Sequence, residues 1–331
     1  MPDRLTDDRV SVTFFLITYN QERYIREAIE GAFSQTYAPL EIVISDDCST
    51  DGTFRIIEEM CEKYDGSHNI VVNRNTENLG VIAHINRITD LSSGELIICA
   101  AGDDISLPHR TEKVVERYLA TGRRASLIHS SVYLIDREGN RVGTRLPPLI
   151  SQGMTIEEIA LSDALFIGAT IAYTRKIEEM FGTIKYSKCF EDLVMGFRSA
   201  LAGSLEYISE PMLLYRYESG ISACSTLQNE PFNERIAREI RHQEMYLAVM
   251  AQRLVDLERI GNDELQPLVK NKRAAVLLKR KVWMGNYRFL RLLSYSTKRG
   301  YLGLFLSLLL RKKKRGIIFS INKVVFKSAI N

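Results

Sequence analysis

Short apolar segments alternate with segments of helical periodicity over about the first 120 residues, and this alternation is the strongest constraint on the fold. The expected strands are short and rich in apolar side chains, and they cover residues 10–17, 40–45, 69–73 and 95–100. Helices are expected between them, including residues 80–91 and a helix that begins near Pro108. Such alternation predicts an α/β fold with a mostly parallel sheet and helices on both faces. Sheets of this kind bind ligands outside the carboxyl ends of their strands.

The rhythm of the sequence changes after residue 120. The expected elements there are strands at residues 126–136, 166–175 and 211–220 and a helix at residues 190–203. From residue 229 onward the pattern is mainly helical. We therefore expect an α/β domain at residues 1–228, with halves at 10–120 and 121–228, followed by a helical, basic extension at residues 229–331.

Adjacent aspartates follow two of the expected strands. Asp46 and Asp47 lie in "VISDDCSTDGT", and Asp103 and Asp104 lie in "LIICAAGDDI". Neighbouring carboxylates are tolerated where a cation or hydrogen-bond donors lie among them. Mg²⁺ is often held by one or two carboxylates, with phosphate oxygens completing its coordination. Gly102 would let the backbone approach a ligand closely. The alternative is that these residues only form turns and helix caps.

The order of these motifs resembles glycosyltransferase family 2, the inverting enzymes of the GT-A fold. The resemblance covers roughly residues 10–220. The segments that carry it are "TYN" at residues 18–20, "DDCSTDGT" at 46–53, "NLG" followed by Asn86, and "AAGDDISLPHR" at 100–110. Each motif is weak alone, but the ordered set is specific. The resemblance implies a GT-A sheet and a nucleotide-sugar donor.

Roles for individual residues follow from this resemblance. The nucleotide-sugar contacts that it implies are Thr18, Tyr19, Asn20, Asp46, Asp47, Asn86, Asp103 and Arg216. Tyr19 would lie against the base, which offers a π-face for stacking, and Asp47 would accept a hydrogen bond from the base. Asp104 and Asp103 would hold a divalent cation, Mg²⁺ or Mn²⁺. Ala101 stands where many relatives have a further aspartate, so which of Asp103 and Asp104 contacts the metal is open.

An acidic pair at the start of the expected helix 190–203 also matches the family. The resemblance implies that Asp192, with Glu191 second, is the general base that takes the proton of an acceptor hydroxyl group. Acidic residues are also common at helix N-termini because they complement the helix dipole, which is the structural alternative.

Arg216, in "YRYESGIS", stands where family members place a basic residue against the diphosphate. A surface ion pair is the alternative for this arginine. His84, His109 and His129 lack the spacing of metal ligands. We interpret them as surface histidines or as core histidines with hydrogen-bond partners, although His109 with Arg110 could border the diphosphate.

The charge of the chain is unevenly distributed. No acidic residue follows Glu264, and residues 270–331 contain 17 Lys and Arg, whereas the rest of the chain has 27 basic and 41 acidic residues. An apolar segment at residues 301–310 is too short to span a bilayer, and five basic residues, 311–315, follow it. This interleaving predicts that residues 270–331 bind an anionic membrane surface. A helical subdomain packed on the body is the alternative, and nucleic acid is not expected as a partner.

The five cysteines, Cys48, Cys61, Cys99, Cys189 and Cys224, form no C-x-x-C pair. This usage argues against a disulfide framework and suits a reducing cytoplasm. No apolar stretch near the N-terminus resembles a signal peptide. We expect a cytoplasmic enzyme that is peripheral on the inner face of the membrane.

The sequence thus predicts an inverting, metal-dependent glycosyltransferase. Its donor is expected to be a nucleotide sugar, with UDP the commonest nucleotide in the family, and its acceptor a lipid-linked glycan. Relatives with this arrangement often build O-antigen or capsule. The alternatives are a non-catalytic nucleotide-sugar-binding scaffold, a nucleotidyltransferase and a membrane-tethering protein. Self-association through the tail helices also stays open.

Overall fold

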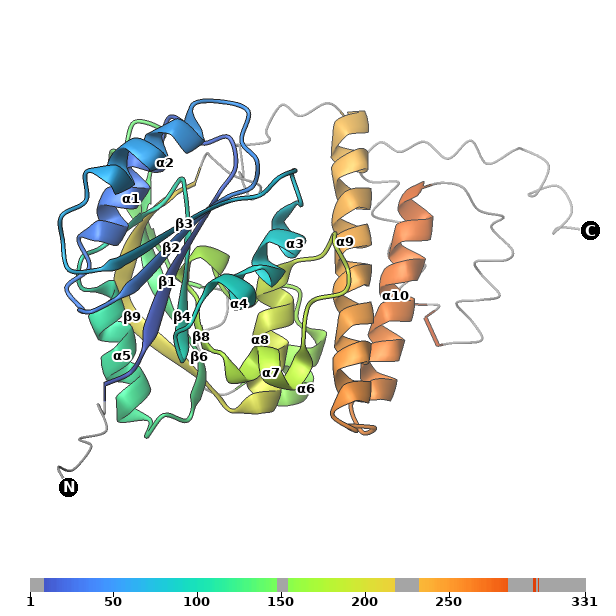
Figure 1. The fold of residues 1–331 in the computed structure, drawn as a ribbon. Helices are drawn as coiled ribbons and strands as arrows, with labels where there is room; N and C mark the ends of the chain where they lie inside the picture. Colours follow the sequence, from blue (N-terminus) through green and yellow to red (C-terminus); the bar gives the residue numbers. More distant parts are fainter. Residues whose placement is uncertain (1–8, 148–153, 218–231, 285–299, 302, 304–331) are drawn as a thin grey trace, which may run out of the picture.

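The computed structural model describes residues 9–147, 154–217 and 232–284, together with residues 300, 301 and 303 (Figure 1). The expected domain boundary near residue 228, Cys224 and most of the basic tail lie outside the described residues. The division into two domains therefore stays a prediction.

The described residues form one nine-stranded sheet with the order β3-β2-β1-β4-β8-β6-β9-β5, and β7 pairs with β6. The strands are β1 (Val12–Thr18), β2 (Glu41–Asp46), β3 (Asn69–Arg74), β4 (Leu96–Ala101), β5 (Ile105–Ser106), β6 (Ala125–Ile135), β7 (Arg141–Arg145), β8 (Ala172–Thr174) and β9 (Ser204–Arg216). The first four strands pair in parallel, as do β6 and β9, whereas β8 runs antiparallel to β4 and β6. The expected mostly parallel sheet is confirmed.

Helices cover both faces of this sheet (Figure 1). They are α1 (Ile25–Phe33), α2 (Thr53–Glu62), α3 (Val81–Asn86), α4 (Ile88–Leu91), α5 (Arg110–Ala120), α6 (Ile156–Leu161), α7 (Lys176–Phe181) and α8 (Glu191–Ala202), with a 3₁₀ turn η1 (Gly168–Thr170). Alternate residues of β1 enter two separate cores. Phe14 packs with α1, α2 and α5, whereas Phe15 packs with α3, α6, α7 and α8.

Three expected elements differ from the structure. The strand expected at residues 211–220 begins at Ser204, because β9 pairs with β6 from that residue onward. The expected helix at residues 80–91 is divided into α3 and α4, because the amide of Arg87 donates to both the Ala83 and His84 carbonyls and closes a tight turn. The expected strand at residues 166–175 begins with η1, where the Thr170 hydroxyl and amide both donate to the Ile167 carbonyl at 2.8 Å. This local bonding competes with strand pairing, so only the three residues of β8 remain extended.

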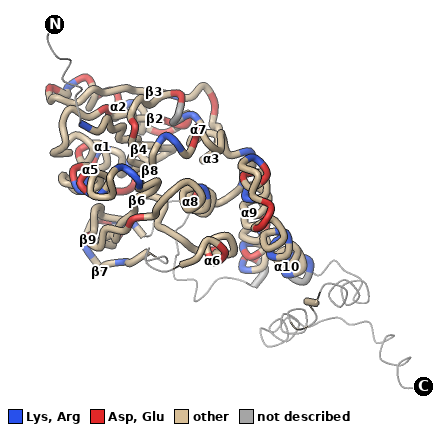
Figure 2. The backbone as a smooth tube through the Cα atoms, turned by 90° about the horizontal axis from the view of Figure 1, so that it is seen from below, with Lys and Arg blue, Asp and Glu red and all other residues tan. Residues whose placement is uncertain are grey.

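Two long helices pack beside the sheet domain. α9 (Phe232–Arg259) lies against α8, and α10 (Gln266–Met284) lies against α9 (Figure 1). Their apolar side chains, including Val249 and Val276, belong to the same core as α8. Figure 2 shows charges of both signs on α9, whereas α10 has no acidic residue. Among the described helices, none is long and apolar enough to cross a membrane.

Candidate active site

The ends of three parallel strands bring the expected motifs together. Thr18 at the end of β1 is in register with Asp46 at the end of β2, and Ile17 is in register with Ala101 at the end of β4. The segments that follow these strands therefore leave the sheet at the same edge. The sequence predicted this juxtaposition from strand order alone.

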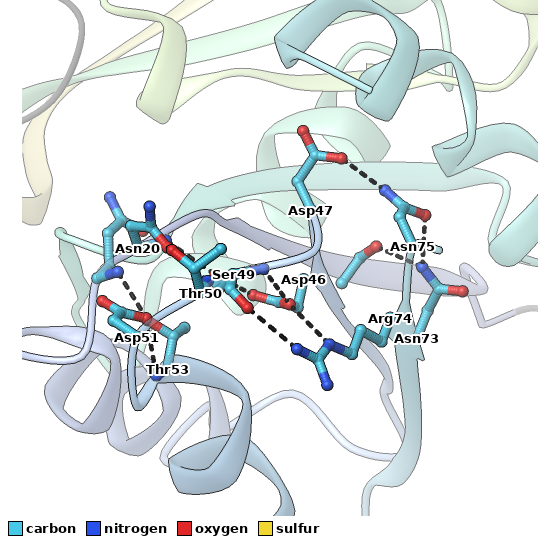
Figure 3. A network of polar contacts seen from close by, with 12 residues as sticks. Asn20, Asp46, Asp47, Ser49, Thr50, Asp51, Thr53, Asn73, Arg74 and Asn75 are labelled. Atoms are coloured by element: carbon cyan, nitrogen blue, oxygen red, sulfur yellow. Dashed lines mark hydrogen bonds and ion pairs between the residues drawn. The ribbon is translucent and has the colours of Figure 1, made fainter. Parts of the chain in front are cut away.

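Asp46 is fully buried and holds the loop after β2 in place (Figure 3). One of its oxygens accepts a hydrogen bond from the Ser49 amide at 2.9 Å and lies 3.6 Å from Arg74 Nε, and the other accepts from the Ser49 hydroxyl. Arg74 also donates to the Ser49 carbonyl at 3.0 Å. Asp46 therefore supports the loop that carries Asp47, and its expected contact with the nucleotide sugar stays a prediction.

Asp47 is 3 % exposed and is surrounded by three hydrogen-bond donors. Its Oδ1 accepts from Asn75 Nδ2 and from the Leu79 amide, and its Oδ2 accepts from the Gly80 amide, each at 2.9 Å. Asn75 in turn accepts from the Asn73 side chain (Figure 3). These bonds fix the orientation of the Asp47 carboxylate at the strand edge, and its expected contact with a base stays a prediction.

The segments after β1 and β2 are hydrogen-bonded to each other. The Asn20 backbone amide donates to the Ser49 hydroxyl at 2.8 Å, and the Asn20 side-chain oxygen accepts from the Thr50 backbone amide at 2.9 Å. Asn20 and Cys48 both have positive φ, 51° and 61°. Asn tolerates this region better than Cys does, so Cys48 is a strained residue of the kind found at functional sites. The positive φ of Cys48 changes the direction of the chain between Asp47 and Ser49.

Thr18 and Tyr19 lie at this edge too. The Thr18 hydroxyl donates to Gln21 Oε1 at 2.8 Å, and the Tyr19 side chain is 44 % exposed, which leaves its ring accessible to a ligand. A β-carbon on Gly102 would lie 2.3 Å from Gln21 Oε1 and 2.7 Å from the Thr18 hydroxyl. Only glycine therefore fits between β1 and the two aspartates that follow β4.

Asp103 and Asp104 are both buried, at 8 % and 6 % exposure. Asp104 Oδ1 accepts a hydrogen bond from the Arg216 amide at 2.9 Å. Burial raises the pKa of Asp104 well above its usual range, and the neighbouring charge of Asp103 raises it further. A buried carboxyl pair of this kind gains stability when a cation neutralises it.

The chemistry of this pair fits a hard divalent cation that is completed by phosphate oxygens. Among the described residues, no group of three or more His, Cys, Asp and Glu side chains could hold a metal by itself. Two carboxylates are nevertheless enough for Mg²⁺ when a diphosphate supplies further ligands. Asp103 and Asp104 would be the two carboxylate ligands.

Arg216 is buried and bound to the backbone rather than exposed. Its guanidinium donates to the carbonyls of Asp103, Asp136 and Arg137 and forms a 2.6 Å ion pair with Glu27. The group also lies 4.3 Å from the centroid of the Tyr24 ring. It ties the end of β9 to the aspartate segment. The expected contact with a diphosphate stays a prediction and would require Arg216 to exchange one of these partners.

The hydrogen bonds of the Asn86 side chain do not join it to the residues at the ends of β1, β2 and β4. Its amide donates to the Ile184 carbonyl and accepts from the Ile184 amide, both at 2.9 Å. Asn86 thus joins α3 to the segment before α8, and its expected nucleotide contact stays a prediction.

The three histidines differ from one another. His84 is a buried histidine with a partner, since its Nε2 lies 2.6 Å from the Ser45 hydroxyl, as the sequence predicted. His109 is partly exposed, and its Nε2 lies 3.3 Å from a Glu210 carboxylate oxygen without forming a hydrogen bond among the described residues. For His129 the interpretation was wrong, because both ring nitrogens are buried without a hydrogen-bond partner among the described residues. Burial lowers the pKa of His129 to about 4, so the ring is neutral between Phe166 and Tyr207.

Glu191 and Asp192 begin α8, beside η1. A β-carbon on Gly168 would lie 2.9 Å from Glu191 Oε1, so this glycine makes room for the carboxylate. Asp192 Oδ1 accepts a hydrogen bond from the Leu193 amide at 2.8 Å. Within the described chain, the Glu191 carboxyl accepts a hydrogen bond only from its own backbone. Burial raises the pKa of both carboxyls, and the charge of Asp192 raises that of Glu191 further. Raised carboxyl pKa values suit proton transfer near neutral pH.

The acidic pair and the strand edge are connected through η1. The Cys99 amide of β4 donates to the Ile171 carbonyl at 3.0 Å, and buried Arg110 donates to the carbonyls of Cys99 and Ala169. Arg110 therefore faces the backbone, and the idea that it borders a diphosphate has no support in its contacts. This bonding places Gly168, and with it Glu191, beside the strand that leads to Asp103.

Sequence reasoning missed several residues of this site. Ser49, Asn75 and Gly80 orient the two aspartates after β2, and Gly168 faces Glu191. Clusters of small and amide residues after expected strands, such as "NTENLG" after β3, were the available signal.

A family model described as Glycosyl transferase family 2 matches residues 13–181, just over half of the chain. The match includes the ends of β1, β2 and β4 and stops before α8.

Curated proteins of other organisms are similar to part of this chain. EpsE of Bacillus subtilis, a glycosyltransferase by description, is 27 % identical over 187 residues, which are 56 % of this chain and 66 % of EpsE. The protein Rv1520 of Mycobacterium tuberculosis is 29 % identical over 202 residues, which are 60 % of this chain and 57 % of Rv1520. The matched region therefore spans less than two thirds of each relative.

Solved structures share the fold. S. aureus TarS 1-349, also solved in complex with UDP-GlcNAc, has a TM-score of 0.55 at 15 % identity, and the likeness covers 93 % of both chains. The mannosyltransferase PcManGT from Pyrobaculum calidifontis, solved in complex with GDP-Man and Mn²⁺, has a TM-score of 0.52 at 16 % identity, covering 92 % of this chain and 87 % of PcManGT. At these identities the likeness concerns the fold alone, and it confirms the expected GT-A architecture.

Proposed function

This chain belongs to glycosyltransferase family 2, and we propose that it is an inverting, metal-dependent enzyme that transfers a sugar from a nucleotide-sugar donor to a glycan hydroxyl group. One observation supports the proposal most directly. Two buried aspartates follow β4, and η1, which is linked to β4 by hydrogen bonds, lies against Glu191 and the β-carbon of Asp192, whose carboxyls both have raised pKa values. A cation-binding pair and a proton-accepting pair are the two groups that such a transfer needs.

On the donor side, the residues at the strand edge would bind the nucleotide. The exposed ring of Tyr19 would stack on the base, and the oriented carboxylate of Asp47 would accept a hydrogen bond from it. Asp103 and Asp104 would hold Mg²⁺ or Mn²⁺ beside the diphosphate. A bound cation of this kind would supply positive charge that stabilises the departing nucleoside diphosphate.

On the acceptor side, Asp192 would act as the general base and Glu191 would neighbour it. The carboxylate takes the proton of the acceptor hydroxyl as that oxygen forms a bond to the anomeric carbon. The bond between this carbon and the diphosphate oxygen breaks, and the nucleoside diphosphate leaves with the electron pair. A single displacement inverts the configuration of the anomeric carbon.

The acceptor that we propose is a lipid-linked glycan of a cell-surface polysaccharide such as O-antigen or capsule. The support is the basic extension, which would hold the enzyme at the anionic inner face of the membrane. Val269 and Val276 of α10 pack in the core, so a truncation should keep α10 intact. The full chain should sediment with anionic vesicles, and a chain that ends at Met284 should not. Equal sedimentation of both would contradict this assignment.

The decisive experiment is calorimetric titration of the full chain with UDP, GDP and dTDP, each with and without Mn²⁺. We expect metal-dependent binding of one nucleotide, with UDP the first candidate. Transfer assays with the matching sugar nucleotides should then separate an enzyme from a non-catalytic scaffold. If no nucleotide binds under either condition, the proposed function is wrong.

A further inference from the structure

Three polar side chains on α9 are fully buried where apolar side chains would be expected. Gln252, Arg253 and Asp256 each have 0 % exposure. A buried polar group is costly unless hydrogen bonds replace its water. The partners of these three residues therefore indicate what the helix holds in place.

Arg253 bridges the end of α6 and the beginning of α8. Its Nη1 donates to the Ala160 carbonyl at 2.8 Å and to the Ser162 carbonyl at 3.2 Å, and its Nη2 donates to the Leu193 carbonyl at 3.1 Å. Leu193 directly follows Asp192. The planar guanidinium reaches both segments at once, a geometry that a lysine ammonium cannot reproduce.

Asp256 and Gln252 attach α9 to α8 and to the segment before it, on either side of the contact between Arg253 and Leu193. Asp256 accepts two hydrogen bonds from buried Arg198 of α8, both at 2.9 Å, and one from Gln252 at 2.8 Å. Gln252 Oε1 accepts from the Lys185 amide at 2.8 Å, in the segment that leads into α8. The first two turns of α8 are thus attached to α9 by polar bonds with fixed geometry.

Arg253 also influences the charge of the acidic pair. Among the described residues, the titratable groups that interact with Asp192 and Glu191 are each other, Cys189, Cys99 and Arg253. Arg253 is the positively charged one, and its charge opposes the rise that burial causes in the pKa of Asp192. Burial lowers the pKa of Arg253 itself to about 10, which keeps it charged at neutral pH.

We propose that Arg253 is a positioning residue for the Asp192–Glu191 pair, so that α9, which follows the family-matched region, is part of the catalytic unit. Arg253 fixes the turn that carries the pair and supplies the positive charge beside it. The catalytic consequence rests on the proposed function, whereas the effect on carboxyl ionisation does not.

Arg253→Met, Arg253→Lys and Arg259→Met test this role in the full chain. Arg259 is an exposed residue on α9 that donates to the Phe181 carbonyl at 3.1 Å, so its variant is a matched control. The first measurement follows aspartate carboxyl resonances by NMR in ¹³C-labelled protein, with Asp192→Asn identifying the signal of Asp192. In Arg253→Met the pKa of Asp192 should rise by about one unit, because an opposite charge has been removed. Arg253→Lys and the control should leave it near the wild-type value.

The second measurement is transfer kinetics. Arg253→Met and Arg253→Lys should both lower kcat by about 10- to 100-fold, because the base is misplaced. The KM for the donor should change by less than about threefold, since Arg253 does not touch the proposed donor site. The acidic limb of the pH profile should move to higher pH in Arg253→Met and stay in place in Arg253→Lys.

Each outcome bears on the proposal. An unshifted Asp192 titration in Arg253→Met would overturn it even if the chain transferred no sugar, so its failure is separable from failure of the proposed function. If Arg253→Met does not fold, Arg253→Lys decides. A lysine variant with the kcat of the Arg259→Met control would show that Arg253 is merely structural.

Discussion

Asp46 and Asp47 on the donor side and Glu191 and Asp192 on the acceptor side are both adjacent carboxyl pairs, but their surroundings differ. Each donor-side aspartate accepts hydrogen bonds from backbone and side-chain donors (Figure 3). On the acceptor side, Asp192 accepts from the Leu193 amide, and in the described chain no other residue donates to Glu191. The first pair is held in one orientation, whereas the second has capacity left for a ligand or a proton.

The electrostatic consequence follows from this contrast. Hydrogen bonds to a carboxylate stabilise its charged form, and burial without such bonds destabilises it. The acceptor-side pair accordingly has raised pKa values. Asp104, beside Asp103, has few donors and a raised pKa as well. Fully hydrogen-bonded carboxylates suit recognition and support, and poorly hydrogen-bonded ones suit cation binding and proton transfer.

The largest expected effect comes from the acceptor-side pair. Asp192→Asn should lower kcat by about 10³-fold, because the amide cannot accept a proton from the acceptor hydroxyl. The affinity for the donor nucleotide should stay within about threefold of wild type, because Asp192 makes no donor contact in the proposed site. Single-turnover transfer and calorimetry measure the two quantities. A variant that retains most of its turnover would assign the base elsewhere, with Glu191→Gln as the next substitution to assay.

A smaller effect is expected at the strand edge. Asp104→Asn should weaken nucleotide binding in Mn²⁺ by about 10- to 100-fold, because one metal ligand loses its charge. Binding in EDTA should be weak in both proteins, so the difference between them should disappear there. Asp263→Asn, at an exposed position on the chain, is the control. Equal affinities of Asp104→Asn and wild type in Mn²⁺ would remove Asp104 from the metal site.

The sequence predicted the sheet and the positions of the aspartates well, for a physical reason. Strand periodicity is local, and parallel strands end at a common edge, so the places of Asp46 and Asp104 followed from order alone. Asp192 was placed at the start of a helix by the same kind of local pattern.

Contacts between distant segments could not be predicted in this way. Arg216 was expected to face a diphosphate, but it is buried against backbone carbonyls of the segment after β6. Arg253 gave no signal at all, because its partner Leu193 lies 60 positions away in the sequence. The surroundings of a long polar side chain depend on packing, which periodicity does not report.

Asp46→Asn examines the donor-side half of the comparison. The substitution should lower the free energy of unfolding by about 2 kcal/mol, because a buried acceptor of two Ser49 hydrogen bonds becomes partly a donor and its attraction to Arg74 is lost. Urea denaturation at pH 7 measures the change. Asp65→Asn, at an exposed position, should change it by less than about 0.5 kcal/mol. An Asp46 variant as stable as the control would mean that these bonds do not hold the loop.

Glu191→Gln examines the acceptor-side half of the comparison. It should raise the free energy of unfolding, whereas Asp46→Asn should lower it. Because the pKa of Glu191 is higher in the folded protein than in the unfolded chain, the unfolded chain loses its proton first as the pH rises. Stability is therefore lost between the ordinary glutamate pKa of about 4.3 and the raised value. The amide removes this penalty, so the variant should be more stable than wild type at pH 8 by on the order of 1 kcal/mol and equally stable at pH 4. Denaturation at both pH values, with Glu77→Gln as the exposed control, measures the difference. A loss of stability at pH 8 would mean that Glu191 has stabilising partners like those of Asp46, and the contrast between the two pairs would fail.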